Sequence, residues 1–383
     1  MSGIELDFGA ITIDNSTFKS EGYKFYEGLL AQMRQFKESP VQVIQTDIVH
    51  NEAIKHIAQE ISKARASINQ ALRAANKQLK IKSNDIEKAE KILSIEGAEK
   101  DIAYERLTKY YEYIGANIIK SGEYADLTTL MDMYFSTLAP FETGKDKKSE
   151  FPDAIALLSI EAWAEENDLN IIAVSQDNGW KDFSEQTDRI TVVNSLAEAL
   201  EKFQPHNKVA SIIAHIREDS VFDADNHILE EIENAIINQL DGADIYVEAD
   251  SSMSFEWDDV SATYISHELD SDKDDLVKIR VVRIEDESIV LKLGATVEVE
   301  VEASFDFSIR DSIDNDYVQM GGNTCTTTES FHTDILLTLS GDFSQDFDKI
   351  EIVNIEILES LTSAYFGEVE PDWQSQPDED ESW

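Results

Sequence analysis

Short apolar runs alternate with amphipathic stretches along the first 200 residues. Four of these runs are rich in β-branched residues, as buried strands are: AITID at 10–14, VQVIQTDIV at 41–49, LNIIAVSQD at 169–177 and RITVV at 189–193. The stretches between them place apolar residues at helical spacing, most clearly in FPDAIALLSIEAWAEE at 151–166. Strand and helix in succession predict an α/β domain, with a parallel sheet flanked by helices.

A long segment of this half has helical spacing without a strand signal. From Ala53 to about Ile119 the chain is rich in Lys, Arg, Glu and Ala, and we expect a helical insertion at about residues 55–145. Within it, ISKARASINQALRAANKQLKIK carries six basic residues. This basic face is either a nucleic-acid contact or an ordinary solvated helix surface, and the sequence leaves both open.

The period changes after a boundary region at Pro205–Arg217. Beyond a helical piece at roughly Asn226–Gln239, apolar and polar residues alternate as in half-exposed antiparallel strands. The alternating segments are 244–250, 262–269, 277–284, 288–309, 331–343 and 351–358. We therefore predict an α/β domain at 1–205, a mostly antiparallel β (α+β) domain at 220–370, and a disordered acidic tail at 371–383.

Charge is distributed unevenly over the 383 residues, whose net charge is −46. The part from Val221 onward has 42 Asp and Glu but 7 Lys and Arg, whereas the first 220 residues have 36 and 25. The acidic half should repel nucleic acid, so a nucleic acid must approach the N-terminal half. The single cysteine, Cys325, excludes an intrachain disulfide and a cysteine-based zinc site. No apolar run of about 18 residues and no signal-like start are present, so we expect a cytoplasmic protein without membrane contact.

Acidic residues occur where the predicted strands end. Asp14 and Asp177 each end a strand, Asp153 begins the helix that leads into the strand before Asp177, and Glu52 follows another strand. In parallel sheets, ligand sites form beyond these carboxyl ends. Carboxylates gathered there need a counter-charge, and Mg²⁺ or Mn²⁺ prefers oxygen ligands. One or two such ions can activate a water for attack on a phosphodiester.

Three short strings carry a family resemblance. They are IDNS at 13–16, KSEFPDAIALLSI at 148–160 and AVSQDNGW at 173–180. Together with Glu52 early in a helix, these strings resemble the acidic motifs of PIN domains. The resemblance covers about 190 residues and implies a Mg²⁺- or Mn²⁺-dependent nuclease that cleaves RNA, or sometimes single-stranded or flapped nucleic acid. The KxEFPDA-like string followed by a β domain resembles one bacterial PIN-like subfamily.

The resemblance assigns roles to five residues. Asp14, Glu52, Asp153 and Asp177 match the metal-binding catalytic acids, and Ser175 matches a position near the metal-bound water. It also suggests three lesser roles: orientation of Asp14 by Asn15 or Ser16, extra ligation by Glu150 and Asp182, and a phosphate contact by Lys148. About 100 residues separate Glu52 from Asp153, more than in minimal PIN domains, so the helical insertion should shape substrate access.

Each of these acids also has a structural interpretation. Asp14 could cap the next turn, Asp153 could stabilise a helix N-terminus, and Asp177 could open a turn with Asn178-Gly179. Asp47 competes with Glu52 for the second acidic position.

Two histidines and the tryptophans are weaker candidates. His50 and His56 are six residues apart, on different faces of a helix, so we do not expect a zinc site. Trp163, Trp180 and Trp257 are expected to pack in the core or at its rim rather than to stack on bases. Gly321-Gly322 is expected to form a turn, because no lysine follows it as in a phosphate-binding loop.

Two hypotheses for function follow. The first is a metal-dependent endonuclease that acts on RNA rather than DNA, with a bacterial toxin or phage-defence role suggested by the resemblance alone. The second is an interaction or regulatory protein whose acidic β domain binds a basic partner, mimics nucleic acid or restrains the nuclease domain. A homo-oligomer is expected from family habit.

Overall fold

A computed structural model describes residues 8–37, 39–80, 83–93, 97–142, 147–204, 227–271, 276–285, 287–310, 316–341 and 350–372. The chain divides into two compact units, Met1–Pro205 and His206–Trp383. The expected boundary region at 205–217, and the tail from residue 373, lie outside the described residues. None of the described helices is long and apolar enough to span a membrane.

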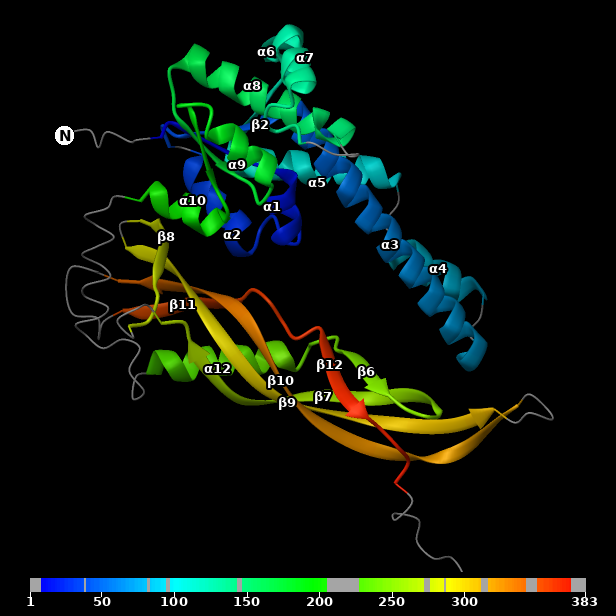
Figure 1. Cartoon of the computed structure of the whole chain (residues 1–383). Coiled ribbons are helices and arrows are strands. Elements are labelled where there is room, and N and C mark those ends of the chain that lie inside the picture. Colours follow the sequence, from blue (N-terminus) through cyan, green and yellow to red (C-terminus); the bar gives the residue numbers. More distant parts are fainter. Residues whose placement is uncertain are drawn as a thin grey trace, which may run out of the picture. The chain divides into compact units, whose positions relative to one another are not determined.

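The N-terminal unit is built on a parallel sheet of five strands in the order β3-β2-β1-β4-β5 (Figure 1). The strands are β1 (Ala10–Ile13), β2 (Gln42–Thr46), β3 (Ala116–Ile119), β4 (Ile171–Val174) and β5 (Ile190–Val193). Every residue of β1 and β4 is buried, as expected for central strands covered by helices on both faces. The predicted α/β class is confirmed.

Helices connect these strands. They are α1 (Asn15–Ser20), α2 (Gly28–Gln32), the 3₁₀ turn η1 (Met33–Phe36), α3 (Asp47–Leu79), α4 (Ser83–Leu93), α5 (Glu99–Ile114), α6 (Ser121–Tyr124), α7 (Leu127–Ser136), η2 (Lys147–Glu150), α8 (Phe151–Asn167), α9 (Asn178–Ser184) and α10 (Leu196–Lys202). The strand expected at 41–49 ends at Thr46, whose Oγ1 accepts the Val49 N–H at 3.2 Å and caps α3. The helix therefore starts earlier than the Asn51-Glu52 region.

The segment expected to be helical through Ile119 contains a strand. Gly115 ends α5 with a left-handed backbone, φ +72°, which a glycine adopts without steric cost. The next four residues form β3, which pairs with β2 at the edge of the sheet. A four-residue run is too short to interrupt a helical pattern in the sequence, so β3 was missed. The interval expected as an insertion thus contributes a strand to the sheet.

The C-terminal unit combines one long helix with antiparallel strands. Its elements are α12 (His227–Leu240), β6 (Tyr246–Asp250), β7 (Ser254–Leu269), β8 (Arg280–Ile284), β9 (Ser288–Arg310), β10 (Tyr317–Ser340), β11 (Glu351–Ile357) and β12 (Ser363–Glu368). The main sheet has the order β11-β10-β9-β7, with β8 also on β9. Ile232 and Ile236 of α12 share its core with Val297 and Val299. The predicted mostly antiparallel class is confirmed.

Two details of this unit differ from the sequence expectation. β12 was not predicted, and it pairs with β6 in parallel rather than antiparallel fashion. Gly321 and Gly322 do not form a turn but lie inside β10, next to a register shift at Gln319/Gly321. Gly321 has φ +109°, so this irregularity needs a residue without a Cβ.

The strand β9 separates apolar from acidic side chains. Its valines are buried, whereas Glu298, Glu300 and Glu302 on the other face are exposed. Glu300, for example, lies opposite Thr263 of β7 and Thr328 of β10. Because like charges directly opposite each other destabilise a sheet, the neutral hydroxyl neighbours allow β9 to carry successive acids.

Candidate metal site in the N-terminal unit

The candidate site lies where the order of the sheet changes direction. From β1 the chain moves outward to β2 and β3 on one side, then returns to β4 on the other side of β1. Asp14 directly follows β1, and its backbone N–H donates to Val174 O at 2.9 Å. Ser175 and Asp177 directly follow β4. Residues after β1 and β4 thus meet at the switch point, where α/β sheets form ligand sites.

Ser175 joins the acids that follow β1 and β4. It is fully buried, and its Oγ donates to Asp14 Oδ2 at 3.1 Å while accepting the Asp177 N–H at 3.1 Å. Asp14, 6% exposed, also accepts the Asn15 N–H at 2.6 Å, the Ser16 N–H at 3.2 Å and the Ser16 hydroxyl. Asp14 therefore caps α1 and stands in a fixed orientation.

Asp177 caps a helix as well. Its Oδ1 accepts the Gly179 N–H at 2.7 Å at the start of α9, and its side chain is exposed. A Cβ on Gly179 would lie 2.9 Å from Pro140 Cβ and 3.0 Å from Asp177 Oδ1. The turn after β4 therefore has little room for a larger residue at position 179.

Asp153 is held by a tryptophan. It lies in the first turn of α8, next to Pro152, which suits an initial helical position. The buried Trp180 donates from Nε1 to Asp153 Oδ1 at 3.0 Å. The bond links the start of α8 to α9, and it fixes one oxygen of Asp153.

Glu52 joins these acids, whereas Asp47 does not. Burial raises the pKa of Glu52, and the negative charge of Asp14 raises it further, while Lys55 opposes the rise. Asp47, five residues earlier on α3, instead accepts the Ser121 N–H at 3.0 Å, at the edge of the sheet formed by β3. Of the two rivals for the second acidic position, Glu52 is the one coupled to Asp14.

The four acids form one electrostatic neighbourhood. Burial is the largest cause that raises the pKa of Asp153 to about 7. The hydrogen bond from Trp180 opposes the rise, and the negative charges of the three other acids, Asp14, Asp177 and Glu52, add to it.

The side chains are nevertheless not arranged as a complete ligand set. Within the described parts of the chain, no three Asp, Glu, His or Cys side chains form a group that could hold a metal ion. Two of the acids turn toward the backbone amides of the helices that they cap, and Asp153 turns toward Trp180. Mutual repulsion favours this separation when no cation lies between the carboxylates.

Comparison with known proteins agrees with this geometry. A family model described as a PIN domain matches residues 11–180. This segment is a PIN-like domain. The match begins in β1 and ends at Trp180, so it contains all four acids and Ser175. PIN domains are generally nucleases and typically use divalent metals such as Mg²⁺ or Mn²⁺. No curated protein and no solved structure matched the chain.

The match does not reach the C-terminal unit. The bacterial subfamily, the toxin or phage-defence role, the protein partner and the homo-oligomer therefore stay predictions. The second hypothesis, in which the acidic β unit binds a basic partner, is likewise untested.

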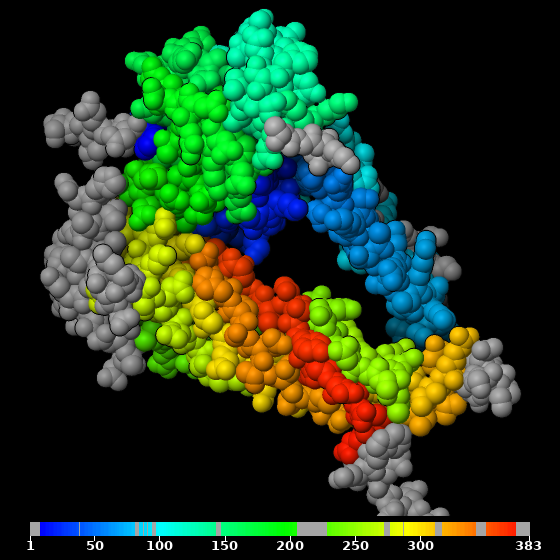
Figure 2. Space-filling view, in the orientation of Figure 1, coloured from blue at the N-terminus to red at the C-terminus, as the bar shows by residue number. Residues whose placement is uncertain are grey.

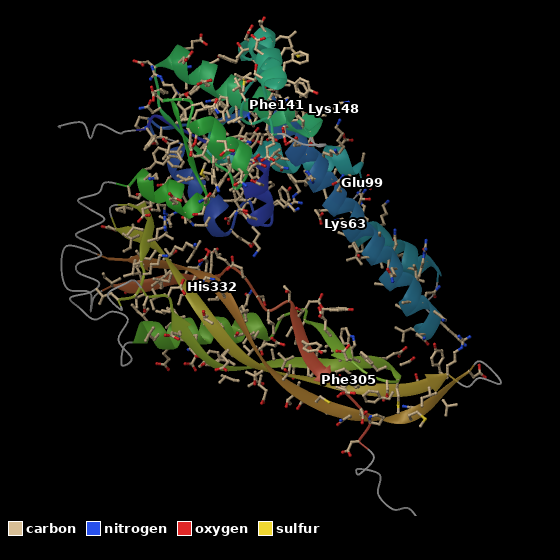
Figure 3. The ribbon with its side chains drawn as sticks, in the orientation of Figure 1. Lys63, Glu99, Phe141, Lys148, Phe305 and His332 are labelled. Atoms are coloured by element: carbon tan, nitrogen blue, oxygen red, sulfur yellow. The ribbon has the colours of Figure 1, made fainter. Side chains whose placement is uncertain are left out.

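The lesser candidates of the PIN-like domain differ in their contacts. Glu150 Oε2 accepts the Glu142 N–H at 2.8 Å, and Asp182 is exposed on α9. Lys148 is exposed on η2 (Figure 3). Among the candidates for orienting Asp14, Ser16 contacts it through its hydroxyl and its amide.

The two histidines of α3 also lie apart. His50 is 8% exposed and packs against the rings of Tyr104 and Tyr111 of α5, whereas His56 lines a surface pocket. Burial lowers the pKa of His50. Trp180 packs in the core, as expected, but its hydrogen bond to Asp153 was not predicted. The need of a buried indole for an acceptor is the only signal that could have indicated the bond.

A pocket of about 400 Å³, which was not predicted, lies beside α1 and α3, and the hydroxyl of Tyr23 in its lining donates to Oδ1 of Asn15, the residue after Asp14, at 3.5 Å. It is lined by Lys19, Gly22, Tyr23, His56, Ile57, Glu60 and Arg106. Lys19 lies one helical turn after Asn15, and His56 lies one turn after Glu52. Burial, with the charge of Glu60, raises the pKa of Tyr23 to about 12, so its hydroxyl stays a donor. Lys19 and Arg106 form no ion pair with a described residue, which leaves them available to an anion.

Proposed function

We propose that the PIN-like domain is a metal-dependent endonuclease that hydrolyses phosphodiester bonds of RNA, with Mg²⁺ or Mn²⁺ as its cofactor. The observation that supports this best is the meeting of residues after β1 and β4 at the switch point, where Ser175 bridges Asp14 and Asp177. Asp153 and Glu52 belong to the same charged neighbourhood. Cations beside this neighbourhood, Lys19 and Arg106, suit a phosphate chain.

The donor set fits a hard divalent cation. All four acids supply oxygen, the ligand type that Mg²⁺ and Mn²⁺ prefer. Asp14 Oδ1 accepts one described hydrogen bond, from the Asn15 N–H, and so keeps a lone pair for a further partner. When bound, the ion would activate a water and stabilise negative charge on the phosphate under attack.

The residues around the acids have supporting roles. Ser175 and Ser16 hold Asp14 in one orientation, so little entropy is lost when its free lone pair is used. Trp180 holds Oδ1 of Asp153 and leaves Oδ2 without a described hydrogen bond. Asp153 must lose its proton to serve as a ligand, and a nearby cation favours that loss.

The test is cleavage of a panel of RNA and DNA substrates in Mn²⁺ by the full chain. Asp14→Asn and Asp153→Asn should each abolish cleavage while the protein stays folded by circular dichroism. Asp188→Asn, an equal change at an exposed position, is the control and should cleave like wild type. Equal activity of all three variants, or a wild type that neither cleaves nor binds Mn²⁺, would refute the proposal.

A further inference from the structure

A helical arm extends from the PIN-like domain. The helix α3 has 33 residues and is therefore about 50 Å long. Its distal part packs against α4, and the two form an arm that stands out from the rest of the N-terminal unit (Figures 1 and 2). Half-buried residues of α3 recur along the arm at alternating spacings of three and four, as in a helix-helix seam. They are Ile61, Arg65, Ile68, Leu72 and Ala75.

The base of the arm is fastened at one point of this seam. Arg65 Nη1 donates to Glu99 Oε1 at 2.7 Å, and its Nη2 donates to Gly97 O at 2.9 Å. Both partners lie at the start of α5, which packs on α3 in the body of the domain. The arm is thus held in a set direction where it leaves the domain.

The face of α3 opposite the seam carries a different set of residues. Counting from Glu52 with the same alternating spacing gives His56, Gln59, Lys63, Ala66, Gln70, Arg73, Lys77 and, just past the helix end, Lys80. At 100° per residue, these positions stay on one side of the helix, and the seam lies on the other. One helix face therefore runs from the candidate metal site to the tip of the arm.

This face differs in charge from the rest of the chain. Residues 61–80 contain five Lys and Arg and no Asp or Glu, although the chain has 78 acids and 32 bases. Arg73, Lys77 and Lys80 are exposed and form no ion pair with a described residue. Lys63 (Figure 3) pairs with Glu60 at 2.7 Å, but its side chain is 72% exposed. Solubility does not explain these cations, because the net charge of −46 already supplies it.

The chemistry of the face favours a duplex over a single strand. No aromatic residue occurs between Ile61 and Lys80, so the arm lacks the stacking platforms of single-strand binders. Lysine, arginine and glutamine side chains suit phosphate and sugar contacts instead. We propose that this face of α3 binds the backbone of a double-stranded segment that flanks the cleavage site. That the duplex flanks a cleavage site rests on the proposed function.

The length of the helix sets where the duplex lies. Lys63 is 11 residues from Glu52 and Lys77 is 25 residues from it, which correspond to about 17 Å and about 38 Å along the axis. An RNA duplex is A-form and rises about 2.8 Å per base pair, so the contacts would lie roughly 6 to 14 pairs from the site. A substrate with a paired stem next to an unpaired cleavage point matches this arrangement.

Binding is measured on the full chain in EDTA, where no metal-dependent cleavage occurs. The probes are a labelled hairpin RNA with a 16-pair stem and an unpaired RNA strand of equal length. Their binding is followed by fluorescence anisotropy at several salt concentrations. Arg73→Gln with Lys77→Gln should weaken stem binding by up to roughly 60-fold at 0.1 M salt, because each lost phosphate contact is worth about eightfold there. The slope of log K against log salt should become less steep by about 2.

The matched control removes two cations that are already paired with acids. Lys109→Gln with Lys120→Gln makes the same change in net charge, but Lys109 lies 2.7 Å from Glu105 and Lys120 lies 3.6 Å from Glu123. This control should bind the stem like wild type. Circular dichroism of each variant shows whether the arm remains helical.

Three outcomes would overturn the proposal. They are equal stem binding by the arm variant and the control, unpaired RNA that binds as tightly as the stem, and a wild type that binds no nucleic acid. The last outcome would indicate that the cations of α3 bind an acidic protein instead. Failure of the proposed function is a separate result, because Asp14→Asn would then cleave like wild type in Mn²⁺ whatever the anisotropy shows.

Discussion

Replacement of Asp153 by asparagine should stabilise the protein at alkaline pH and remove its activity at the same time. Asp153 is mostly buried among three other acids, and burial is the largest cause that raises its pKa to about 7. Asparagine has nearly the same shape, and its amide oxygen can still accept the Nε1–H of Trp180, which lies 3.0 Å from Asp153 Oδ1. The variant thus removes the charge and keeps the hydrogen bond.

The size of the effect follows from the shift in pKa. An ordinary aspartate has a pKa of 3.8, so the shift to about 7 corresponds to about 4 kcal/mol at roughly 1.36 kcal/mol per unit. Between these values the folded state keeps a proton that the unfolded state has lost. The free energy of unfolding therefore falls as pH rises from about 4 to 7, and the full penalty is present above pH 7.

Thermal denaturation in EDTA tests this reasoning. At roughly 2–4 °C per kcal/mol for a unit of this size, and with solvent relaxation lowering the full penalty, Asp153→Asn should melt about 5–10 °C above wild type at pH 8. At pH 5 Asp153 keeps its proton in the folded state but has largely lost it in the unfolded state, so about 1.6 kcal/mol of the penalty remains. The difference should therefore be less than half of that at pH 8, and it should vanish below about pH 4. The control Asp188→Asn should show no such pH-dependent gap.

The reasoning would be refuted by a gap of equal size at pH 5 and pH 8, or by a variant that melts below wild type at pH 8. Addition of Mn²⁺ at pH 8 gives an independent check. It should raise the melting temperature of wild type more than that of Asp153→Asn, because the ion relieves the repulsion that the variant has already reduced.

Two further predictions concern the surroundings of the acids. Ser175→Ala removes the hydroxyl that contacts Asp14 and Asp177, so kcat and the affinity for Mn²⁺ should each fall by about 10- to 100-fold; unchanged Mn²⁺ affinity by calorimetry would contradict the bridging role. Lys19→Gln with Arg106→Gln removes two cations of the pocket that form no ion pair with a described residue, so KM for RNA should rise about tenfold or more at 0.1 M salt while kcat changes little. Steady-state kinetics that show a lower kcat at constant KM would place these cations at the reacting phosphate instead.

The sheet and the acids at its edge were predictable because their signals are local. Apolar β-branched runs mark the buried strands β1 and β4, and in a parallel sheet the residues just after such strands must share one edge. Asp14 and Asp177 follow from this rule alone. The alternation in β9 is equally local, since burial on one face fixes every second residue.

Other features depend on contacts between distant segments, which a single sequence does not reveal. Asp47 and Glu52 look equivalent in the sequence, and they differ because Asp47 meets the backbone of Ser121 whereas Glu52 is coupled to Asp14. β3 is too short to have its own pattern, and it forms because an edge beside β2 is open to it. The bond between Trp180 and Asp153 joins residues 27 positions apart.

The negative charge of the four acids affects the stability of the fold, the binding of a metal ion and the approach of the substrate. RNA, the proposed substrate, is a polyanion, and it would have to approach four carboxylates in a chain of net charge −46. The cations of the pocket and of α3 reduce the repulsion between the RNA and the acids. They do not reduce the repulsion among the four carboxylates. A proton on Asp153 relieves this local repulsion below pH 7, and a divalent ion can relieve it above pH 7. Only the ion leaves Asp153 ionised and available as a ligand, so the conditions that most favour the metal-free fold are those in which the proposed chemistry cannot proceed.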